Sequence, residues 1–218
     1  MTSLLRDECG SHSGGRRRRP RRTTTLLLLL AMTPLGACAK QVKWEEEVPL
    51  NTGETIIVKR QVEYTLQGSA GNPLDIGWKP ASGGSVMRFT WRDREYRFDR
   101  HGSPMVLTIS SEGMPVLLAI AGIGWSAKNN YRCTVPNYVQ FVPDESGQHW
   151  TWPPSVDSVF FNLKTNLLQK IPRPETPERR YRVEELDAIN AAALARSPER
   201  KRIEPGYTGD LCNKRRGS

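Results

Sequence analysis

Alternation of apolar and polar positions predicts β-strands along most of the chain after residue 43. The alternation is clearest over residues 86–98, where a polar turn at 92–94 separates two arms. The large apolar side chains expected on its aromatic faces are Met87, Phe89, Trp91, Tyr96 and Phe98. Because aromatic faces that meet across a hairpin stabilise antiparallel pairing, this pattern predicts ordinary sheet packing against a core.

Turn residues and β-branched runs predict further strands on both sides of this hairpin. A first hairpin is expected over residues 43–64, with a turn signal at 51–53 between its arms. Other strands are expected at residues 104–110, 115–123, 138–142, 149–152 and 156–163. The run 116–121 is apolar on both faces, which fits a buried central strand or a short buried helix. Residues 68–84 are rich in Gly, Ser and Pro, and they predict a loop in which Trp78 is the only large anchor.

Short strands about ten residues apart are typical of a sandwich or a small barrel. We therefore expect residues 44–171 to form a mainly β domain, as a small antiparallel sandwich or a barrel-like fold. Residues 172–181 are expected to be a Pro-rich linker, because proline cannot continue a strand ladder. Helical spacing of apolar residues predicts a C-terminal helix within 182–197, followed by a polar basic tail at 198–218.

Basic charge is concentrated at the start of the chain. The protein has 218 residues and a formal net charge of +9, and residues 1–37 contain seven Arg against two acidic residues. More than half of the excess positive charge therefore lies in the first sixth of the chain. The charge of residues 38–218 gives little support to nucleic-acid binding. We expect no nucleic-acid partner; the alternative is that the arginine block at 16–22 stays uncut and binds one.

Residues 16–38 have the order of a secretory signal, with an arginine block, an apolar run and then small residues. The apolar segment at 23–35 would span about 20 Å as a helix, which is short of the ~30 Å hydrocarbon core of a bilayer. The segment therefore fits an export signal and not a membrane-spanning anchor.

The end of this segment, Leu35-Gly36-Ala37-Cys38, resembles the lipobox of bacterial lipoproteins. The resemblance implies that the Cys38 thiol receives a diacylglycerol, that the chain is cut before Cys38, and that the new amino group is acylated. Residues 1–37 would then be a cleaved signal peptide, and residues 38–43 a lipidated tether. Two or three acyl chains would make membrane attachment stable. The alternative is an ordinary secretory signal in which Cys38 is incidental.

The lipobox resemblance also implies a location and partners. Ala39 stands where Asp would favour retention in the inner membrane, so we expect transfer to the outer membrane, facing the periplasm. The implied partners are the lipoprotein processing and sorting machinery, and then an unidentified envelope protein or glycan. The mature opening over residues 44–56 resembles a group of uncharacterised proteobacterial lipoproteins, and this likeness implies no activity.

Apart from Cys38, which is expected to carry the lipid, the mature chain contains two cysteines, Cys133 and Cys212. In an oxidising compartment two such thiols most simply form a disulfide. It would close a loop of about 80 residues and contribute roughly 4 kcal/mol in the chain-entropy model. The alternative is that Cys133 and Cys212 are unrelated thiols.

No motif nominates a catalytic residue, a metal ligand or a cofactor. The mature chain has His101 and His149 only, without Cys-x-x-Cys, a nucleophile elbow or a phosphate-binding loop. The three consecutive glutamates at 45–47 would point to alternate faces of a strand and cannot converge on one ion. We interpret these glutamates as a solvated strand edge. The sequence favours a non-catalytic structural or interaction module.

Trp150 and Trp152 are the basis of the alternative function. They are expected to share one strand face, and prolines follow at 153–154. Exposed, the pair would stack on a sugar ring or a peptide, as in an envelope hydrolase or a carbohydrate-binding or peptidoglycan-binding accessory protein. Buried, the pair would be part of the core.

Overall fold

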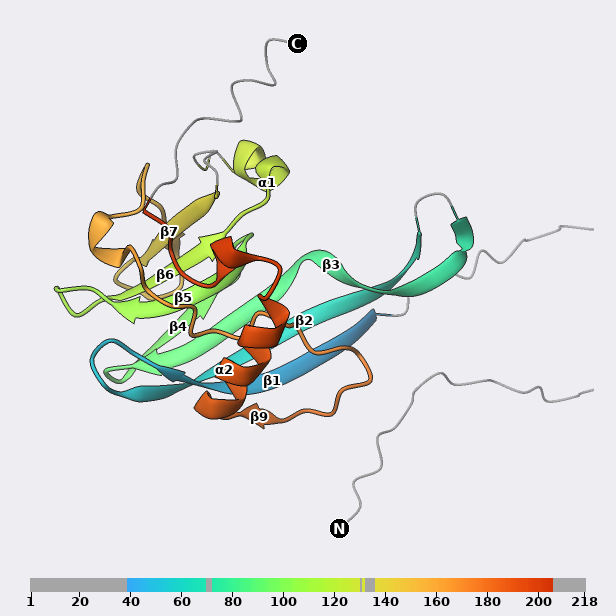
Figure 1. The fold of residues 1–218 in the computed structure, drawn as a ribbon, viewed down its shortest axis with the longest axis horizontal. Coiled ribbons are helices and arrows are strands. Elements are labelled where there is room, and N and C mark those ends of the chain that lie inside the picture. Colours follow the sequence, from blue (N-terminus) through green and yellow to red (C-terminus); the bar gives the residue numbers. More distant parts are fainter. Residues whose placement is uncertain (1–38, 70–71, 130, 132–135, 206–218) are drawn as a thin grey trace, which may run out of the picture. The chain divides into compact units, whose positions relative to one another are not determined.

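The computed structural model describes residues 39–69, 72–129, 131 and 136–205, which all belong to one structural unit, Ala37–Ser218. The first sheet has the order β4-β3-β2-β1-β9 and consists of β1 (Ala39–Pro49), β2 (Thr55–Ser69), β3 (Asn72–Trp91), β4 (Arg94–Phe98) and β9 (Arg180–Tyr181) (Figure 1). The second sheet has the order β5-β6-β7-β8 and consists of β5 (Ser103–Ile109), β6 (Pro115–Ile120), β7 (Tyr138–Pro143) and β8 (Trp150–Thr151). The helices are α1 (Ile123–Lys128), α2 (Val183–Ala193) and two 3₁₀ turns, η1 (Ser158–Phe160) and η2 (Pro198–Arg200).

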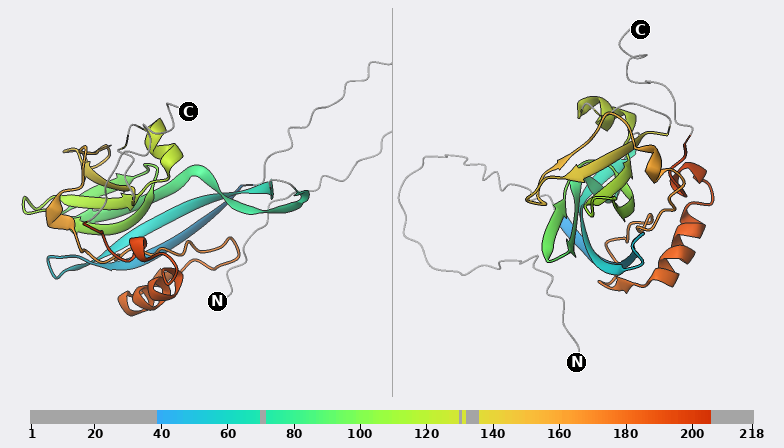
Figure 2. Two further views of the ribbon diagram at one scale, coloured as in Figure 1. Left: turned by 45° about the horizontal axis from the view of Figure 1, so that its top comes forward. Right: turned by 90° about the vertical axis from the view of Figure 1, so that its left-hand side faces the viewer.

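The two sheets form separate layers with the main apolar core between them (Figure 2). Neighbouring strands are antiparallel except for β9, which runs parallel to β1. Neither sheet closes on itself. The prediction of a mainly β fold with a C-terminal helix is therefore confirmed, and the layered alternative is the one observed. The short helix α1 was not predicted.

The hairpin predicted over residues 86–98 is confirmed. Trp91 pairs with Arg94 across a two-residue turn, in which Arg92 and Asp93 have φ angles of 48° and 62°. Positive φ at both central residues matches the twist of a tight hairpin. All five predicted apolar side chains are buried: Met87, Phe89, Trp91, Tyr96 and Phe98. They form the first sheet's contribution to the main core.

The first hairpin is also confirmed, although both of its strands are longer than predicted. β1 begins at Ala39, which pairs with Thr65, so residues 39–43 lie in a strand where a tether was expected. The predicted loop over 68–84 is wrong, because most of it belongs to β2 and β3. Pro80 pairs with Tyr64 at a point where β3 has no second neighbour, and an edge strand tolerates proline. The glycine and proline residues of 68–84 therefore predicted a loop where the structure has continuous strands.

The second sheet shows which of two predicted structures the run 116–121 adopts, and it does not include the strand predicted at 156–163. The apolar run at 116–121 lies in β6, which is buried between β5 and β7. The strand predicted at 156–163 is wrong, because residues 158–160 form η1 instead. The Asp157 carboxylate accepts a hydrogen bond from the Val159 amide at 3.1 Å, which starts this 3₁₀ turn. The strands predicted at 138–142 and 149–152 are present as β7 and β8, which pair as a hairpin.

The C-terminal third folds back onto both sheets. The predicted linker at 172–181 ends in β9, and the predicted helix is confirmed as α2, which packs against β1. At the start of α2 the Glu185 carboxylate accepts a hydrogen bond from the Arg182 amide at 3.1 Å. As far as residue 205 the predicted tail is fixed: Ile203 is fully buried, and the Tyr138 hydroxyl donates to the Glu199 carbonyl at 2.6 Å. Residues 206–218 lie outside the described part of the chain.

Candidate functional site

Strand alternation gives the five-stranded sheet one polar face that points away from the core. On β1 the side chains of Val42, Trp44 and Glu46 are buried, whereas Lys43 and Glu45 lie on the other face. The same alternation on β2 and β3 adds more charged residues to this outer face. No second layer of the described chain covers it, so its charged side chains face solvent in a regular array.

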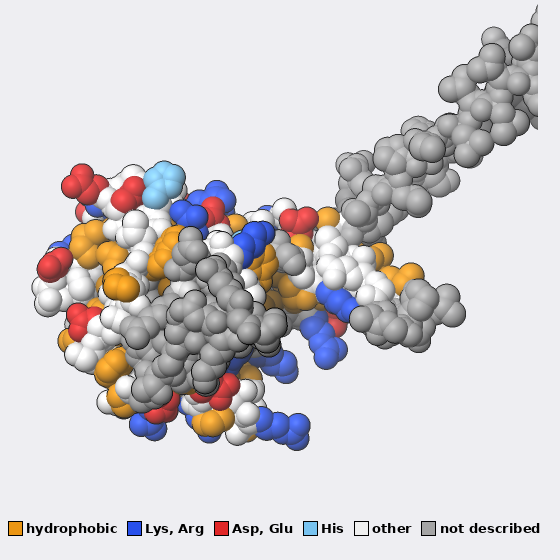
Figure 3. All heavy atoms as spheres, turned by 90° about the horizontal axis from the view of Figure 1, so that it is seen from above, with side chains coloured by type: hydrophobic (Ala, Val, Ile, Leu, Met, Phe, Trp, Pro, Cys, Tyr) orange, Lys and Arg blue, Asp and Glu red, His pale blue; other side chains and the backbone are white. Residues whose placement is uncertain are grey.

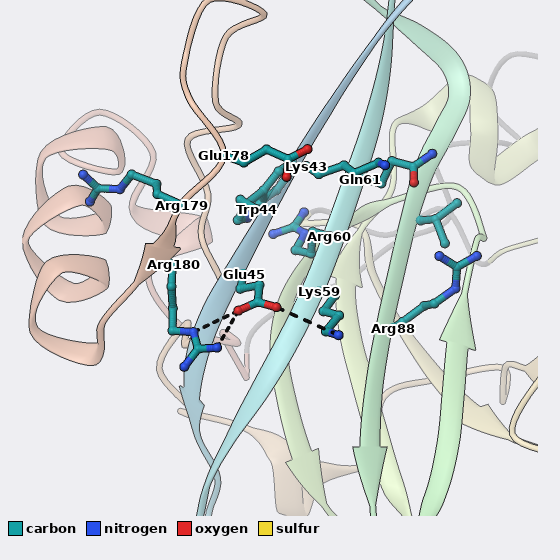
Figure 4. Close-up of a pocket in the computed structure, with 11 residues that line it drawn as sticks. Lys43, Trp44, Glu45, Lys59, Arg60, Gln61, Arg88, Glu178, Arg179 and Arg180 are labelled. Carbon is teal, nitrogen blue, oxygen red and sulfur yellow. Dashed lines mark hydrogen bonds and ion pairs between the residues drawn. The ribbon is translucent and has the colours of Figure 1, made fainter. Parts of the chain in front are cut away.

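A hollow of about 450 Å³ lies on this outer face, between β9 and β3 (Figure 4). We call it the basic trough, and its charged outer lining consists of Lys43, Glu45, Lys59, Arg88, Glu178 and Arg180. A second hollow of about 510 Å³ adjoins it along β2 and β3 and shares Lys59 and Arg88 with it. The basic trough alone is lined by four outward cations and two carboxylates, and the second hollow adds the carboxylate of Glu95. This is chemistry that suits an anionic ligand better than a neutral or cationic one.

Two of these cations pair with Glu45, and two do not. Arg180 donates to one Glu45 carboxylate oxygen from Nε at 2.9 Å and from Nη2 at 2.7 Å, and Lys59 Nζ lies 4.0 Å from the other oxygen. Figure 4 shows Glu45 between these two side chains. Exposed ion pairs contribute little stability, so a competing anion displaces them readily. Within the described residues Lys43 and Arg88 form no ion pair.

The short strand β9 brings Arg180 to the trough from the distant C-terminal segment. The Glu45 amide donates to the Arg179 carbonyl at 3.0 Å, which fixes the parallel register of β9 on β1. Arg179 borders the trough, but its side chain contacts α2: it pairs with Glu185 at 2.9 Å and lies over the Tyr181 ring at 4.3 Å. Arg180 therefore faces the trough while its neighbour fastens β9 to the helix.

A buried ion pair lies on the opposite side of the same strands. Arg60 Nη1 is 3.1 Å from a Glu46 carboxylate oxygen, and the Glu46 side chain is fully buried. The Leu168 amide donates to Glu46 at 2.6 Å, and Arg60 donates to the Leu168 carbonyl at 2.9 Å. Burial raises the pKa of Glu46, while the Arg60 charge acts in the opposite direction. The pair thus joins the first hairpin to the segment that covers it.

The run of three glutamates is only partly as predicted. Glu46 points to the opposite face from Glu45 and Glu47, so the three side chains do not converge. The interpretation of the run as a solvated strand edge is wrong for two reasons. Glu46 is fully buried, and β1 is an interior strand that pairs with both β2 and β9. An acidic run in sequence gave no sign that one member had a buried arginine partner.

Trp150 belongs to the core, and Trp152 packs against it. Trp150 is 1% exposed, its ring meets that of Phe98 edge-on at 5.4 Å, and its ring N–H donates to the Arg97 carbonyl at 2.7 Å. Trp152 is partly buried and meets the Tyr131 ring edge-on at 4.8 Å. Of the two interpretations left open by the sequence, the structure supports core packing. Trp150 offers no surface on which a ligand stacks.

Other sequence-derived candidates are not brought into the trough. Cys38, Cys133 and Cys212 lie outside the described residues. Among the residues that are described, no group of three His, Cys, Asp or Glu side chains is arranged to hold a metal ion. His101 stacks on the Trp125 ring at 3.7 Å, and its pKa is lowered by burial and then by Lys128 and Arg100.

Sequence reasoning missed the residues of the trough. The cations at 43, 59, 88 and 180 are ordinary surface residues when each strand is considered alone. They become neighbours only through the pairing of β9 with β1, β1 with β2 and β2 with β3. The alternation within each strand does place these cations on the side away from the core. That pattern predicts a common site only when the order of the strands in the sheet is known.

Comparison with known proteins adds no relative. No protein-family model matches the chain, and no curated protein or solved structure matches it. In the ranges that the structure describes, no helix is both long enough and apolar enough to cross a membrane. The ligand class of the trough is therefore indicated by the charges that line it.

Proposed function

We propose that the protein is a lipid-anchored, non-catalytic interaction module of the bacterial cell envelope. The lipobox-like sequence that ends at Cys38 carries this proposal, together with its position directly before the first residue of β1, Ala39. An acylated Cys38 would be joined to a folded domain with no intervening linker. Ala39 as the second residue of the mature chain favours the outer membrane, with the domain in the periplasm.

The basic trough is the surface through which we propose that the module binds its envelope partner. Its cations outnumber its carboxylates, and Lys43 and Arg88 are without an ion pair in the described chain. None of the residues that line the trough is a histidine, cysteine or serine that would act as a nucleophile. A carboxylate or phosphate group on an envelope glycan or protein fits this chemistry.

Anchoring is tested by metabolic labelling with an alkyne-tagged fatty acid in wild-type and Cys38→Ala chains, followed by cell fractionation. We expect the Cys38→Ala variant to lose both the label and membrane attachment, because the thiol that carries the lipid is gone. The wild-type label should include a hydroxylamine-resistant part, since the acyl chain on the amino group of Cys38 is held by an amide, which does not react as a thioester does. A Cys9→Ala variant is the matched control, because residue 9 lies in the predicted signal peptide. Label that persists in Cys38→Ala, or an unlabelled wild-type chain, contradicts the anchoring proposal.

Binding at the trough is tested with a fluorescent polyglutamate peptide. Lys59→Glu combined with Arg88→Glu should weaken binding by about tenfold or more, because two attractive charges become repulsive. Binding by the wild-type chain should also fall as salt is added. The matched control is Lys164→Glu with Arg196→Glu, which makes the same charge change at exposed positions outside the trough. Equal weakening in both double variants would show a net-charge effect and contradict the assigned site.

A further inference from the structure

The β2–β3 hairpin extends beyond both sheets as an arm with one apolar face (Figure 1). The register pairs Leu66 with Trp78 and Gly68 with Ile76, and directly opposed residues share a face of a strand pair. The exposed fractions are 46% for Leu66, 63% for Ile76 and 38% for Trp78. Figure 3 shows hydrophobic side chains at the surface of this arm. We call Leu66, Ile76 and Trp78 the arm face.

The other side of the arm is polar. Thr65 pairs with Lys79 and Gln67 pairs with Gly77, and alternation places these residues opposite the arm face. The Gln67 side chain donates to the Thr65 hydroxyl at 2.8 Å, and Lys79 donates to the Gly68 carbonyl at 3.1 Å. The arm is therefore amphipathic, and its apolar side is a distinct surface.

The arm face continues the core side of the sheet beyond the point where the chain covers it. Val62 and Tyr64 lie on the same side and are buried, and the Tyr64 hydroxyl donates to the Pro172 carbonyl at 2.9 Å. One step further along β2, no described segment covers Leu66. Three of the five large apolar side chains that are exposed in the described chain lie on this arm face. Such a concentration of exposed apolar residues marks an interaction surface.

The position of β1 indicates what covers the arm face. Ala39 pairs with Thr65, the neighbour of Leu66, so β1 starts at the base of the arm (Figure 1). Cys38 is bonded to Ala39, and consecutive Cα atoms are about 3.8 Å apart. A lipid on Cys38, the premise taken from the proposed function, would therefore hold the base of the arm at the membrane surface.

We propose that the arm face lies on the lipid surface into which the Cys38 acyl chains insert. From Thr65 to Ser69 the arm extends about 13 Å at 3.3 Å per residue. The arm face therefore extends about 13 Å along the membrane from its base, within a headgroup layer that is about 5–8 Å thick. Trp78 has the amphipathic ring that is enriched at this interface, and Leu66 and Ile76 supply apolar area beside it.

This second contact would fix the orientation of the domain. A lipid on Cys38 alone leaves the domain free to pivot, whereas the arm face adds an attachment on one side of the sheet. The basic trough lies on the opposite face of the same sheet, because Lys43 and Glu45 alternate with the buried residues of β1. The trough would thus stay open to a soluble or wall-bound partner while the arm rests on the membrane.

The test uses the full lipidated protein in phosphatidylethanolamine and phosphatidylglycerol vesicles, with and without lipids brominated near the headgroup. The chain has six tryptophans, so the difference between wild type and Trp78→Phe isolates the fluorescence of Trp78. We expect brominated lipid to quench this difference signal. Leu66→Ser combined with Ile76→Ser should relieve the quenching, whereas Val159→Ser, at a still more exposed apolar site on η1, should leave it unchanged.

The outcomes separate this inference from the proposed function. Acylation of Cys38 is measured by mass spectrometry on the same sample, so an unmodified Cys38 overturns the anchor itself. An acylated protein whose Trp78 signal is not quenched overturns the arm contact alone. A Trp78 signal that brominated lipid does not quench, but that changes when the vesicles are diluted to about one protein each, would indicate that a second copy covers the arm face, and would also overturn the proposal.

Discussion

Replacing Trp150 by alanine is expected to lower the free energy of unfolding by about 3–5 kcal/mol. Trp150 is 1% exposed and lies where the two sheets meet. Its ring is 5.4 Å from that of Phe98, 6.4 Å from Tyr96 and 6.5 Å from Phe89, measured between ring centroids. Alanine would leave a large cavity among these rings and would leave the Arg97 carbonyl without the hydrogen bond that it accepts at 2.7 Å. Urea denaturation followed by circular dichroism measures the loss.

Two further variants test whether the loss follows the amount of buried ring that is removed. Trp150→Phe keeps an aromatic ring and should lose less stability than Trp150→Ala, because its cavity is smaller. Trp152→Ala should also lose less, since Trp152 is only partly buried. A Trp150→Ala chain as stable as wild type would mean that the ring is exposed in solution. That result would return the carbohydrate-binding alternative to consideration.

Local sequence pattern was sufficient for the hairpins because their information lies within a few residues. Met87, Phe89 and Trp91 alternate with polar residues, and Arg92 and Asp93 form the two-residue turn that follows. Two strands that are joined by a short turn pair with each other, so a hairpin can be predicted from residues that are close in sequence. The same is true of α2, whose helical spacing and acidic first turn are contained in one short segment.

Features that depend on long-range pairing could not be predicted in this way. Arg180 reaches Glu45 across 135 positions of sequence, and two residues of β9 are too short a strand to leave a pattern. The arm was taken for a loop because its glycines and Pro80 resemble a break, although they stand on an edge strand that tolerates them. The basic trough includes a residue of β9, and the arm face lies on the strands that were taken for a loop. Both surfaces were therefore missed. Prediction of the candidate surfaces was therefore limited by strand order and not by residue chemistry.

Arg60→Met is expected to destabilise the fold by about 3–5 kcal/mol, because it leaves a buried carboxylate without its counter-charge. The Glu46 side chain is fully buried, and Arg60 is its nearest cation at 3.1 Å. Methionine also removes the hydrogen bond that Arg60 donates to the Leu168 carbonyl and the cation that lies 5.0 Å from the Trp44 ring centroid. Urea denaturation at neutral pH measures this loss against wild type.

The double variant Glu46→Gln with Arg60→Met should recover part of this stability. The introduced glutamine is neutral, and its side-chain carbonyl oxygen can still accept the hydrogen bond that the Leu168 amide donates to Glu46 at 2.6 Å. The isolated buried charge, which is the largest source of instability in Arg60→Met, is then gone. A double variant that is no more stable than Arg60→Met would indicate that the two side chains act mainly through packing.

The pH dependence of Arg60→Met distinguishes a charge effect from a packing effect. Burial raises the pKa of Glu46 above its ordinary value of 4.5, and removal of Arg60 raises the pKa further because the attractive charge is lost. When the folded-state pKa is raised, the stability provided by the protonated carboxyl is fully present below 4.5 and is lost as pH rises through the folded-state pKa. The deficit of Arg60→Met relative to the double variant should therefore be largest at neutral pH and should shrink on acidification. A deficit that is the same at neutral and at acidic pH would mean that the pKa of Glu46 in the folded Arg60→Met chain equals its unfolded value. The buried charge would then not be the cause of the deficit, and the ion pair would not be what joins the hairpin to the segment around Leu168.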